Sequence, residues 1–297
     1  MATKTAAGTM FPAELVSEMF NAVKGHSSLA KLSAQRPIPF NGETVFVFSA
    51  EGEASIVGEG GNKPAGDASV TAKTIRPIKF VYQHRVSNEF IYNAESRINY
   101  LQAFADAFAR KIARGLDIAA IHGVNPADLA DASFKATNSF DGLVTGNTVT
   151  YAAATVDDNI DAAVQMVLAD GYEVNGIAMS PAAGSALAAI KVNGVPQYPE
   201  FRFGQNPEAF YGMGSDVNGT ISTVGAAAGS DTDHVLVGDF ENAFRWGYAK
   251  DIPLEVIEYG DPDGQGDLKR TNEVVLRAEA FIGWGILAAD AFARVKA

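Results

Sequence analysis

The chain has 297 residues, of which 47% are apolar, and it carries a net charge of −12. Its length allows one large domain or two moderate ones, and the absence of cysteine excludes disulfides, thiol catalysis and thiolate metal sites. Because a net negative charge repels nucleic acid at long range, it argues against a dedicated DNA-binding protein. It does not argue against a container that holds DNA without binding it tightly. We expect no membrane segment and no secretory signal, since no apolar run approaches the roughly 18 residues of a span.

An apolar stripe with helical spacing follows about ten small and polar residues at the N-terminus. Pro12 suits the first turn of a helix, and Gly25 suits its end. The stripe consists of Leu15, Val16, Met19, Phe20 and Val23. It predicts either a helix docked on the protein's own core or an arm docked on a neighbour.

The segment from Thr44 to Gln83 predicts a long β-arm. Its strands, at 44–48, 70–75 and 78–82, are rich in β-branched and aromatic residues. Five glycines and Pro64 separate the first two strands and offer little for a core. A two-stranded ribbon is at best marginally stable in water. We therefore expect this arm to lie on something else, such as a neighbouring subunit.

A long amphipathic helix is predicted from Ala94 to His122, with Asn93 as its N-cap. Its apolar residues recur at helical spacing and include Phe104, Phe108, Ile112 and Leu116. At 1.5 Å per residue the helix is roughly 42 Å long, the length of a scaffold that spans a domain. Gly123 and Pro126 end it.

The next part predicts an α/β region. Residues 127–150 are irregular, with a possible short strand at Leu143–Val144. Thr155 then caps a helix that Gly171 closes, a buried strand covers 174–179, and Ser180–Pro181 begins a second helix that reaches Ile190. This helix-strand-helix order predicts one apolar sheet layer.

The C-terminal third is predicted to be mostly β. Residues 193–230 are expected to form loops and short strands. Strands are then predicted at 235–237, 244–248, 254–259, 273–284 and 291–295. Since no internal repeat or linker is evident, the fold class is one interlocked α+β chain.

Residues that could carry chemistry give weak signals. The histidines His26, His84, His122 and His234 lack metal-ligand spacing, so we expect no metal site. The acidic run Asp261, Asp263 and Asp267 resembles a calcium loop only superficially, because Asn272 stands where a bidentate glutamate is needed. A solvated turn at Asp263–Gly264 is the better interpretation.

Catalytic and phosphate-binding motifs are also missing from the sequence. The glycine pairs near 212 and 225 make no phosphate loop, and Ser180 fits a plain helix cap. The pairs Arg110–Lys111 and Lys269–Arg270 predict a solvated helix face and a turn, with a modest chance of contacting phosphate. We expect no enzyme and no cofactor, and favour an architectural protein.

The order of the C-terminal elements resembles the ending of the tailed-phage major capsid proteins with the Hong Kong 97 fold. The segments that carry the resemblance are 237–240, 244–247, 252–256, 272–279, 283–285 and 291–295. The resemblance extends over nearly the whole chain. It implies an N-arm at 1–40, an extended β-hairpin E-loop at 41–85, a P-domain with a long spine helix at 86–135 and 250–285, and an A-domain at 136–249 and 286–297.

This resemblance implies self-assembly into hexamers and pentamers that form an icosahedral shell around double-stranded DNA, without sequence-specific binding. Implied partners are a portal protein, possible cement proteins and a separate scaffolding protein, since the arm begins about ten residues after Met1. The protein would be assembled in the bacterial cytoplasm and reside in the virion. Expected assembly contacts are Glu53, Glu59, Lys63 and Lys73 in the E-loop, and Leu15, Met19 and Phe20 in the N-arm.

Covalent crosslinking is a further property of the family, and two other functions are alternatives to a phage shell. The family's type member joins neighbours by a lysine–asparagine isopeptide bond. Lys63 and Lys73 lie in the arm, but no partner asparagine or activating glutamate can be matched, so crosslinking is not expected. The alternatives are an encapsulin-type nanocompartment, which shares the fold and encloses enzymes, and an α/β enzyme, which would need a pocket with convergent polar groups.

Overall fold

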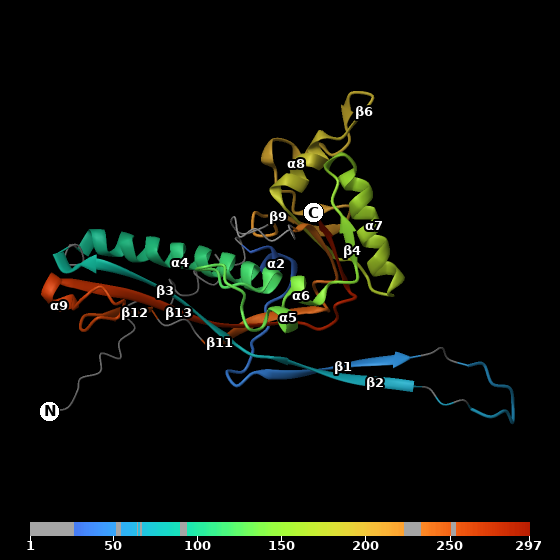
Figure 1. The fold of residues 1–297 in the computed structure, drawn as a ribbon, viewed down its shortest axis with the longest axis horizontal. Helices are drawn as coiled ribbons and strands as arrows, with labels where there is room; N and C mark the ends of the chain where they lie inside the picture. Colours follow the sequence, from blue (N-terminus) through green and yellow to red (C-terminus); the bar gives the residue numbers. More distant parts are fainter. Residues whose placement is uncertain are drawn as a thin grey trace.

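The computed structural model describes residues 27–51, 55–63, 65, 67–89, 94–222, 233–250 and 254–297. The molecule consists of an elongated body built on α4, a lobe at one end of that body, and a β-hairpin that projects beyond the lobe (Figure 1). The predicted helix at 12–25 lies outside the described residues.

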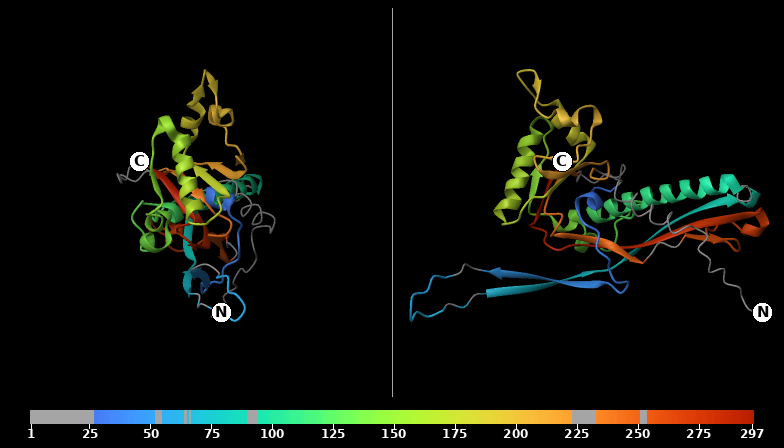
Figure 2. Two further views of the ribbon diagram at one scale, coloured as in Figure 1. Left: turned by 90° about the vertical axis from the view of Figure 1, so that its right-hand side faces the viewer. Right: turned by 180° about the vertical axis from the view of Figure 1, so that it is seen from behind.

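The projecting hairpin consists of β1 (Glu43–Glu51) and β2 (Asp67–Ile75), which pair antiparallel over nine residues each. In the described part of the chain this ribbon forms a sheet of its own and pairs with no further strand. The right-hand view of Figure 2 shows it extending clear of the lobe. The predicted β-arm is therefore confirmed for its first two strands, which are longer than the sequence indicated. The third strand predicted in the arm, at 78–82, instead belongs to the body sheet as part of β3 (Ile78–Ser87), because it pairs with β13.

The body is a helix packed on a twisted sheet. Its central strand is β13 (Glu273–Ile286), which pairs with β3 (Ile78–Ser87) along one edge and with β11 (Phe244–Lys250) and β12 (Leu254–Ile257) along the other. The helix α4 (Ala94–His122) covers this sheet, and it has the predicted bounds. Phe108 and Leu116 of α4 are buried in one cluster with Leu276 and Ala280 of β13.

The lobe contains a sheet of mixed direction with strand order β4-β14-β10-β5-β9-β8. Helices α7 (Val156–Ala169) and α8 (Pro181–Ala189) pack on one face of it, and the other face joins the core of the body. The strands are β4 (Thr148–Thr150), β5 (Gly176–Met179), β8 (Ala209–Phe210), β9 (Met213–Val217), β10 (Asp233–Gly238) and β14 (Phe292–Lys296).

Short elements connect these layers. They are α2 (Ser28–Leu32), α5 (Lys135–Asn138), α6 (Phe140–Leu143), β6 (Lys191–Val192), β7 (Val195–Pro196), α9 (Leu268–Thr271) and two 3-10 turns, η1 (Ala153–Thr155) and η2 (Pro199–Gly204). The strand predicted at Leu143–Val144 is wrong. Ser139 instead caps α6 by accepting a hydrogen bond from the Gly142 amide, and Phe140 packs against Phe292 with ring centroids 4.9 Å apart.

A strap formed by residues 33–38 crosses the body beside β11. The Arg36 amide donates to the carbonyl oxygen of Trp246, and the Trp246 indole donates to the carbonyl of Ser33. A Cβ atom placed on Gly247 would lie 1.7 Å from the Arg36 carbonyl oxygen. Glycine at this position therefore allows the strap to lie directly on the strand.

Replacing Gly247 by alanine is expected to lower the free energy of unfolding by about 1–3 kcal/mol, because the strap must move away from β11. Urea denaturation of the purified chain measures the loss. Gly146→Ala is the matched control, since a Cβ atom there meets no atom within 4 Å. Equal urea midpoints for wild type and Gly247→Ala would contradict the close packing of the strap.

Candidate assembly surfaces

One face of the hairpin is apolar and exposed. The strand register places Phe46 opposite Ala72 and Phe48 opposite Val70, and directly opposed residues share a face. Phe46 is 70% exposed, Phe48 66% and Val70 60%. An apolar face on a projecting ribbon is typical of a surface that is covered in an assembly. We call Phe46, Phe48 and Val70 the hairpin face.

The hairpin tip, residues 55–63, carries a second apolar feature. Ile56 is fully exposed, and Val57 beside it is partly exposed. The Gly61 amide donates to the carbonyl of Gly58, and Gly60 has a φ of +80°, a left-handed conformation that glycine adopts readily. The tip is thus a glycine turn that presents two aliphatic side chains to solvent.

A third exposed apolar surface lies at the outer end of the lobe. Val192 and Val195 belong to the small β6–β7 hairpin, Phe203 lies in η2, and Tyr211 lies in the turn between β8 and β9. Both aromatic residues have a positive φ, +59° and +49°, which costs free energy for bulky side chains. Strained and exposed aromatic residues are more typical of an interaction surface than of a surface shaped for stability alone.

A buried carboxylate fixes the segment at Ser27 and Ser28, which leads into α2. Asp117 of α4 accepts hydrogen bonds from the Ser27 hydroxyl (2.5 Å), the Ser28 amide (2.9 Å) and the Thr220 hydroxyl (2.8 Å). Burial raises the pKa of Asp117 to about 6, although these donors favour the ionised form. Asp117 therefore joins the start of α2 and the loop at Thr220 to α4.

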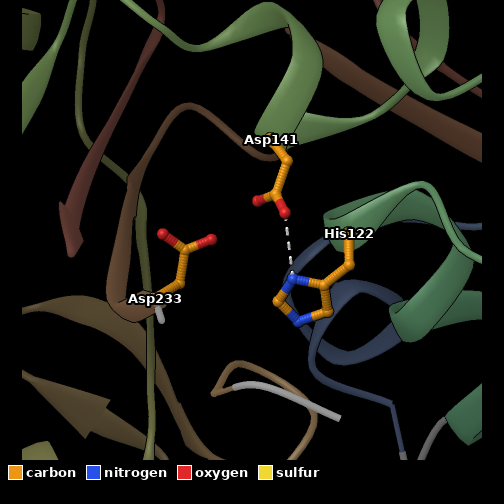
Figure 3. A group of neighbouring side chains, drawn as sticks. All are labelled: His122, Asp141 and Asp233. Atoms are coloured by element: carbon orange, nitrogen blue, oxygen red, sulfur yellow. Dashed lines mark hydrogen bonds and ion pairs between the residues drawn. The ribbon is translucent and has the colours of Figure 1, made fainter. Parts of the chain in front are cut away.

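Four polar side chains form a buried junction between the body and the lobe. His122 ends α4, Asp141 lies in α6, Asp233 begins β10 and Arg294 lies in β14 (Figure 3 shows the first three). Arg294 donates to Asp141 Oδ1 at 2.7 Å and to Asp233 Oδ2 at 2.9 Å. The junction thus ties four separate elements together where body and lobe meet.

The protonation state of His122 follows from its two contacts. Its Nδ1 lies 3.2 Å from Asp141 Oδ2, and its Nε2 lies 3.0 Å from the carbonyl oxygen of Thr220. Both neighbours are acceptors, so both ring nitrogens make hydrogen bonds only when both carry a proton. Burial alone would lower the pKa of His122, but the hydrogen bond and charge of Asp141 raise it above the ordinary value.

The same junction contains three residues whose ligand atoms could approach a metal ion. His122, Asp141 and Asp233 offer atoms within 4.8 Å of one another. The guanidinium of Arg294 already contacts both carboxylates, so a cation is present where a metal would have to bind. Burial and the charge of Asp141 raise the pKa of Asp233 to about 7 against the effect of Arg294. The geometry therefore favours an ion-paired structural junction over a metal centre.

Subunit stability is expected to fall as the pH rises through the raised pKa of His122. The charged imidazole stabilises the fold fully below its unfolded-state value of about 6.5, and this contribution is lost above the folded-state pKa. His122→Gln should be less stable than wild type by roughly 1–3 kcal/mol at pH 6, and the difference should shrink by pH 9. Urea denaturation of the unassembled subunit at several pH values measures it. His84→Gln, at an exposed position, is the control; a pH-independent difference for His122→Gln would contradict the charged state.

Known proteins share this architecture. The model of the phage capsid family matches residues 7–297. The chain belongs to the phage capsid family. A solved structure from Mycobacterium phage Ogopogo is similar with 35% sequence identity and a TM-score of 0.79, and the match covers 91% of this chain and 92% of that one. No curated protein sequence matches the chain.

Two further solved structures share the fold at lower sequence identity. One from Gordonia phage Cozz has 29% identity and a TM-score of 0.75, covering 91% of this chain and 86% of that chain. The capsid of a native GTA particle has 16% identity and a TM-score of 0.63, covering all of this chain and 94% of the other. The fold of this capsid-family chain is the Hong Kong 97-like fold, as its sequence indicated.

Among the assembly contacts predicted from the sequence, those that the structure describes lie at separate places on the hairpin. Glu59 and Lys63 are exposed on the tip, and Lys73 lies in β2 on the face opposite to the hairpin face. Glu53 and the N-arm residues Leu15, Met19 and Phe20 lie outside the described residues. The sequence interpretation missed Phe46, Phe48 and Val70. The alternation of apolar residues at 46 and 48 was the available signal, but only the strand register shows that Val70 joins them.

Two chemical features of the capsid-family chain are structural. The Ser180 hydroxyl lies 3.2 Å from His234 Nδ1, but Ser180 is buried and caps α8 by accepting from the Ala183 amide, as predicted. The turn at Asp263–Gly264 is present, yet Asp263 is not simply solvated. The Asp263 carboxylate forms an ion pair with the Arg85 guanidinium at 2.5 Å. The same guanidinium forms a second ion pair with Glu273.

Among the described helices, none is long and apolar enough to cross a membrane.

Proposed function

We propose that this chain is the major capsid protein of a tailed phage and that its copies assemble into hexamers and pentamers of an icosahedral shell that encloses double-stranded DNA. The single observation that carries the proposal is the hairpin, which projects from the body with Phe46, Phe48 and Val70 exposed. A ribbon of two strands is marginally stable alone, and burying each of these side chains contributes about 1.5–3 kcal/mol. A neighbouring subunit can provide that burial.

The parts of the chain take distinct roles in this proposal. Residues 1–40 form the N-arm, residues 41–85 the E-loop, residues 86–135 and 250–285 the P-domain, and residues 136–249 and 286–297 the A-domain. The exposed aromatic residues Phe203 and Tyr211 at the end of the lobe would face copies around the capsomer axis. The hairpin face would lie on the adjacent subunit.

The charge of the chain suits a container. A net charge of −12 does not trap packaged DNA by non-specific binding, so the DNA would be enclosed without sequence recognition. Assembly in the bacterial cytoplasm would involve a separate scaffolding protein, a portal protein and cement proteins. The Ser180–His234 contact has a structural role in this proposal, because Ser180 is a buried helix cap.

Particles produced with the neighbouring genes of the same genome test this function. The purified particles are treated with DNase, and the nucleic acid that remains is extracted and measured. Double-stranded DNA of uniform length protected inside shells is the expected result. Shells that contain a co-purifying enzyme and no DNA would instead indicate a nanocompartment, and a chain that never enters particles would contradict the proposal.

A further inference from the structure

We propose that Thr220 couples two buried polar centres, so that the attachment of the foot of the N-terminal segment responds to the charge on His122. The foot consists of Ser27 and the short helix α2 (Ser28–Leu32) that follows it. This coupling is a conformational switch within one subunit and does not depend on the formation of shells. Under the proposed function residues 1–26 belong to the N-arm, so the foot is the place where the arm joins the body.

Two buried carboxylates hold the foot in place. Asp117 of α4 accepts hydrogen bonds from the Ser27 hydroxyl at 2.5 Å and from the Ser28 amide at 2.9 Å. Asp216 of β9 accepts from the Ser28 hydroxyl at 2.6 Å and forms an ion pair with Lys31 at 3.0 Å. The donors to Asp117 are neutral hydroxyl and amide groups, and a buried carboxylate held in this way is costly to keep ionised. The loss of one donor to Asp117 therefore weakens the attachment of the foot.

Thr220 lies between the two polar centres. Its hydroxyl donates to Asp117 Oδ2 at 2.8 Å, and its carbonyl oxygen lies 3.0 Å from His122 Nε2. The residue is 2% exposed, and its amide donates to the side chain of Asn218. Asp117 and His122 lie roughly 7.5 Å apart along the axis of α4. One residue of the loop after β9 thus contacts the helix at both places.

The other side of the His122 ring faces the ion-paired junction. Its Nδ1 lies 3.2 Å from Asp141 Oδ2 of α6 (Figure 3), and Asp233 of β10 offers a carboxylate oxygen within 4.8 Å of the ligand atoms of both residues. Arg294 of β14 donates to both carboxylates. The charged groups that face the ring are therefore two carboxylates and one guanidinium, and the neutral carbonyl of Thr220 lies at the remaining ring nitrogen.

The charge on His122 determines whether Thr220 is held in place. A protonated ring donates to Asp141 and to the Thr220 carbonyl at the same time. When the ring loses one proton, the remaining N–H stays with the carboxylate, because a hydrogen bond to a charged acceptor is about twice as strong as a neutral one. The unprotonated Nε2 then faces the carbonyl oxygen, and the two acceptors repel each other. Thr220 moves away, and Asp117 loses one of its donors.

Both titratable groups give the pH dependence the same sign. Burial lowers the pKa of His122, but the hydrogen bond and charge of Asp141 raise it above the ordinary value of 6.5. Burial raises the pKa of Asp117 from 3.8 to about 6. Each group therefore binds its proton more tightly when the foot is docked. Docking is favoured at low pH, and it weakens first between the two Asp117 values and then as the pH rises through the raised pKa of His122.

Hydrogen exchange of the foot tests the coupling. Mass spectrometry of the purified chain measures the protection of residues 27–33, which include the Ser28 and Leu29 amides bonded to Asp117. Rates at each pH are divided by those of an unstructured peptide of the same sequence. We expect at least tenfold less protection at pH 9 than at pH 6, while α7, which packs in the other core cluster, changes less than twofold. Foot protection that is equal at both pH values would overturn the proposal.

Thr220→Val interrupts the link, because valine has a similar shape and no hydroxyl donor. This variant should lower the protection of the foot at pH 6 at least fivefold and remove its dependence on pH between 6 and 9. Thr220→Ser retains a hydroxyl and is the matched control, which should behave like the wild type. The same pH dependence in Thr220→Val as in the wild type would show that Thr220 is not the link.

His122→Gln gives a second measurement that leaves Thr220 unchanged. The glutamine amide can donate to the Thr220 carbonyl but does not titrate, so the foot should be equally protected at pH 6 and pH 9. If Thr220→Val does not fold, which a loss of protection in α7 would show, this variant decides alone, and a foot that still responds to pH in it overturns the proposal. In the double variant the losses should not add, whereas additive losses would show that the two centres act independently.

Discussion

Replacing Phe46 and Phe48 together by serine is expected to abolish shell formation and leave the subunit folded. The two rings are 70% and 66% exposed, so they contribute little to the stability of the isolated chain. If a neighbour buries both, each subunit contact loses about 3–6 kcal/mol, which corresponds to a weakening of roughly 10²–10⁴-fold. Because every subunit repeats the contact, a closed shell should not form. Sedimentation velocity measures the loss of large particles, and thermal melting measures the fold.

Leu168→Ser is the matched control for this double variant. Leu168 is an exposed aliphatic residue on α7, away from the hairpin, so its replacement removes a surface apolar group without affecting the proposed contact. The control should assemble like the wild type. Shells of normal size and yield from the Phe46→Ser, Phe48→Ser variant would show that the hairpin face is not an assembly surface.

Replacing Phe108 by proline is expected to prevent stable folding. Proline inside α4 removes a backbone hydrogen bond and clashes with the preceding turn, at a cost of about 3 kcal/mol or more. Phe108 is also fully buried against β13, and losing a buried phenylalanine costs about 3–5 kcal/mol. The sum approaches the whole stability of a typical domain, about 5–15 kcal/mol. Circular dichroism during heating measures the effect.

Phe108→Leu separates the two causes. Leucine keeps the helix and an apolar side chain, so this variant should melt below the wild type but well above Phe108→Pro. A proline variant with the wild-type melting temperature would contradict the continuous helix from Ala94 to His122.

The elements predicted correctly are those that local patterns determine. The spacing of Phe104, Phe108, Ile112 and Leu116, together with Gly123 after the last turn, indicated α4 with its observed bounds. The cap at Ser180 followed from serine and proline in sequence and is present in α8. Such signals act within a few residues, so the sequence alone is sufficient to identify them.

The features that sequence reasoning missed depend on contacts between distant segments. The apolar pair Leu143–Val144 suggested a strand, but Phe140 is buried among Phe240, Phe244 and Phe292, and this packing favours the short helix α6. The junction of His122, Asp141, Asp233 and Arg294 joins four elements whose spacing in sequence follows no motif. Likewise, the cavity of about 520 Å³ on the body is lined by residues of both α4 and β3, which are distant in sequence.

Association of this subunit with copies of itself through its projecting hairpin can be measured by sedimentation velocity. The purified chain is studied over a range of concentrations, with the neighbouring scaffolding protein added in a parallel series. We expect discrete capsomers or closed shells that grow with concentration and vanish in the Phe46→Ser, Phe48→Ser variant. A folded chain that remains a monomer at every concentration in both series would contradict it.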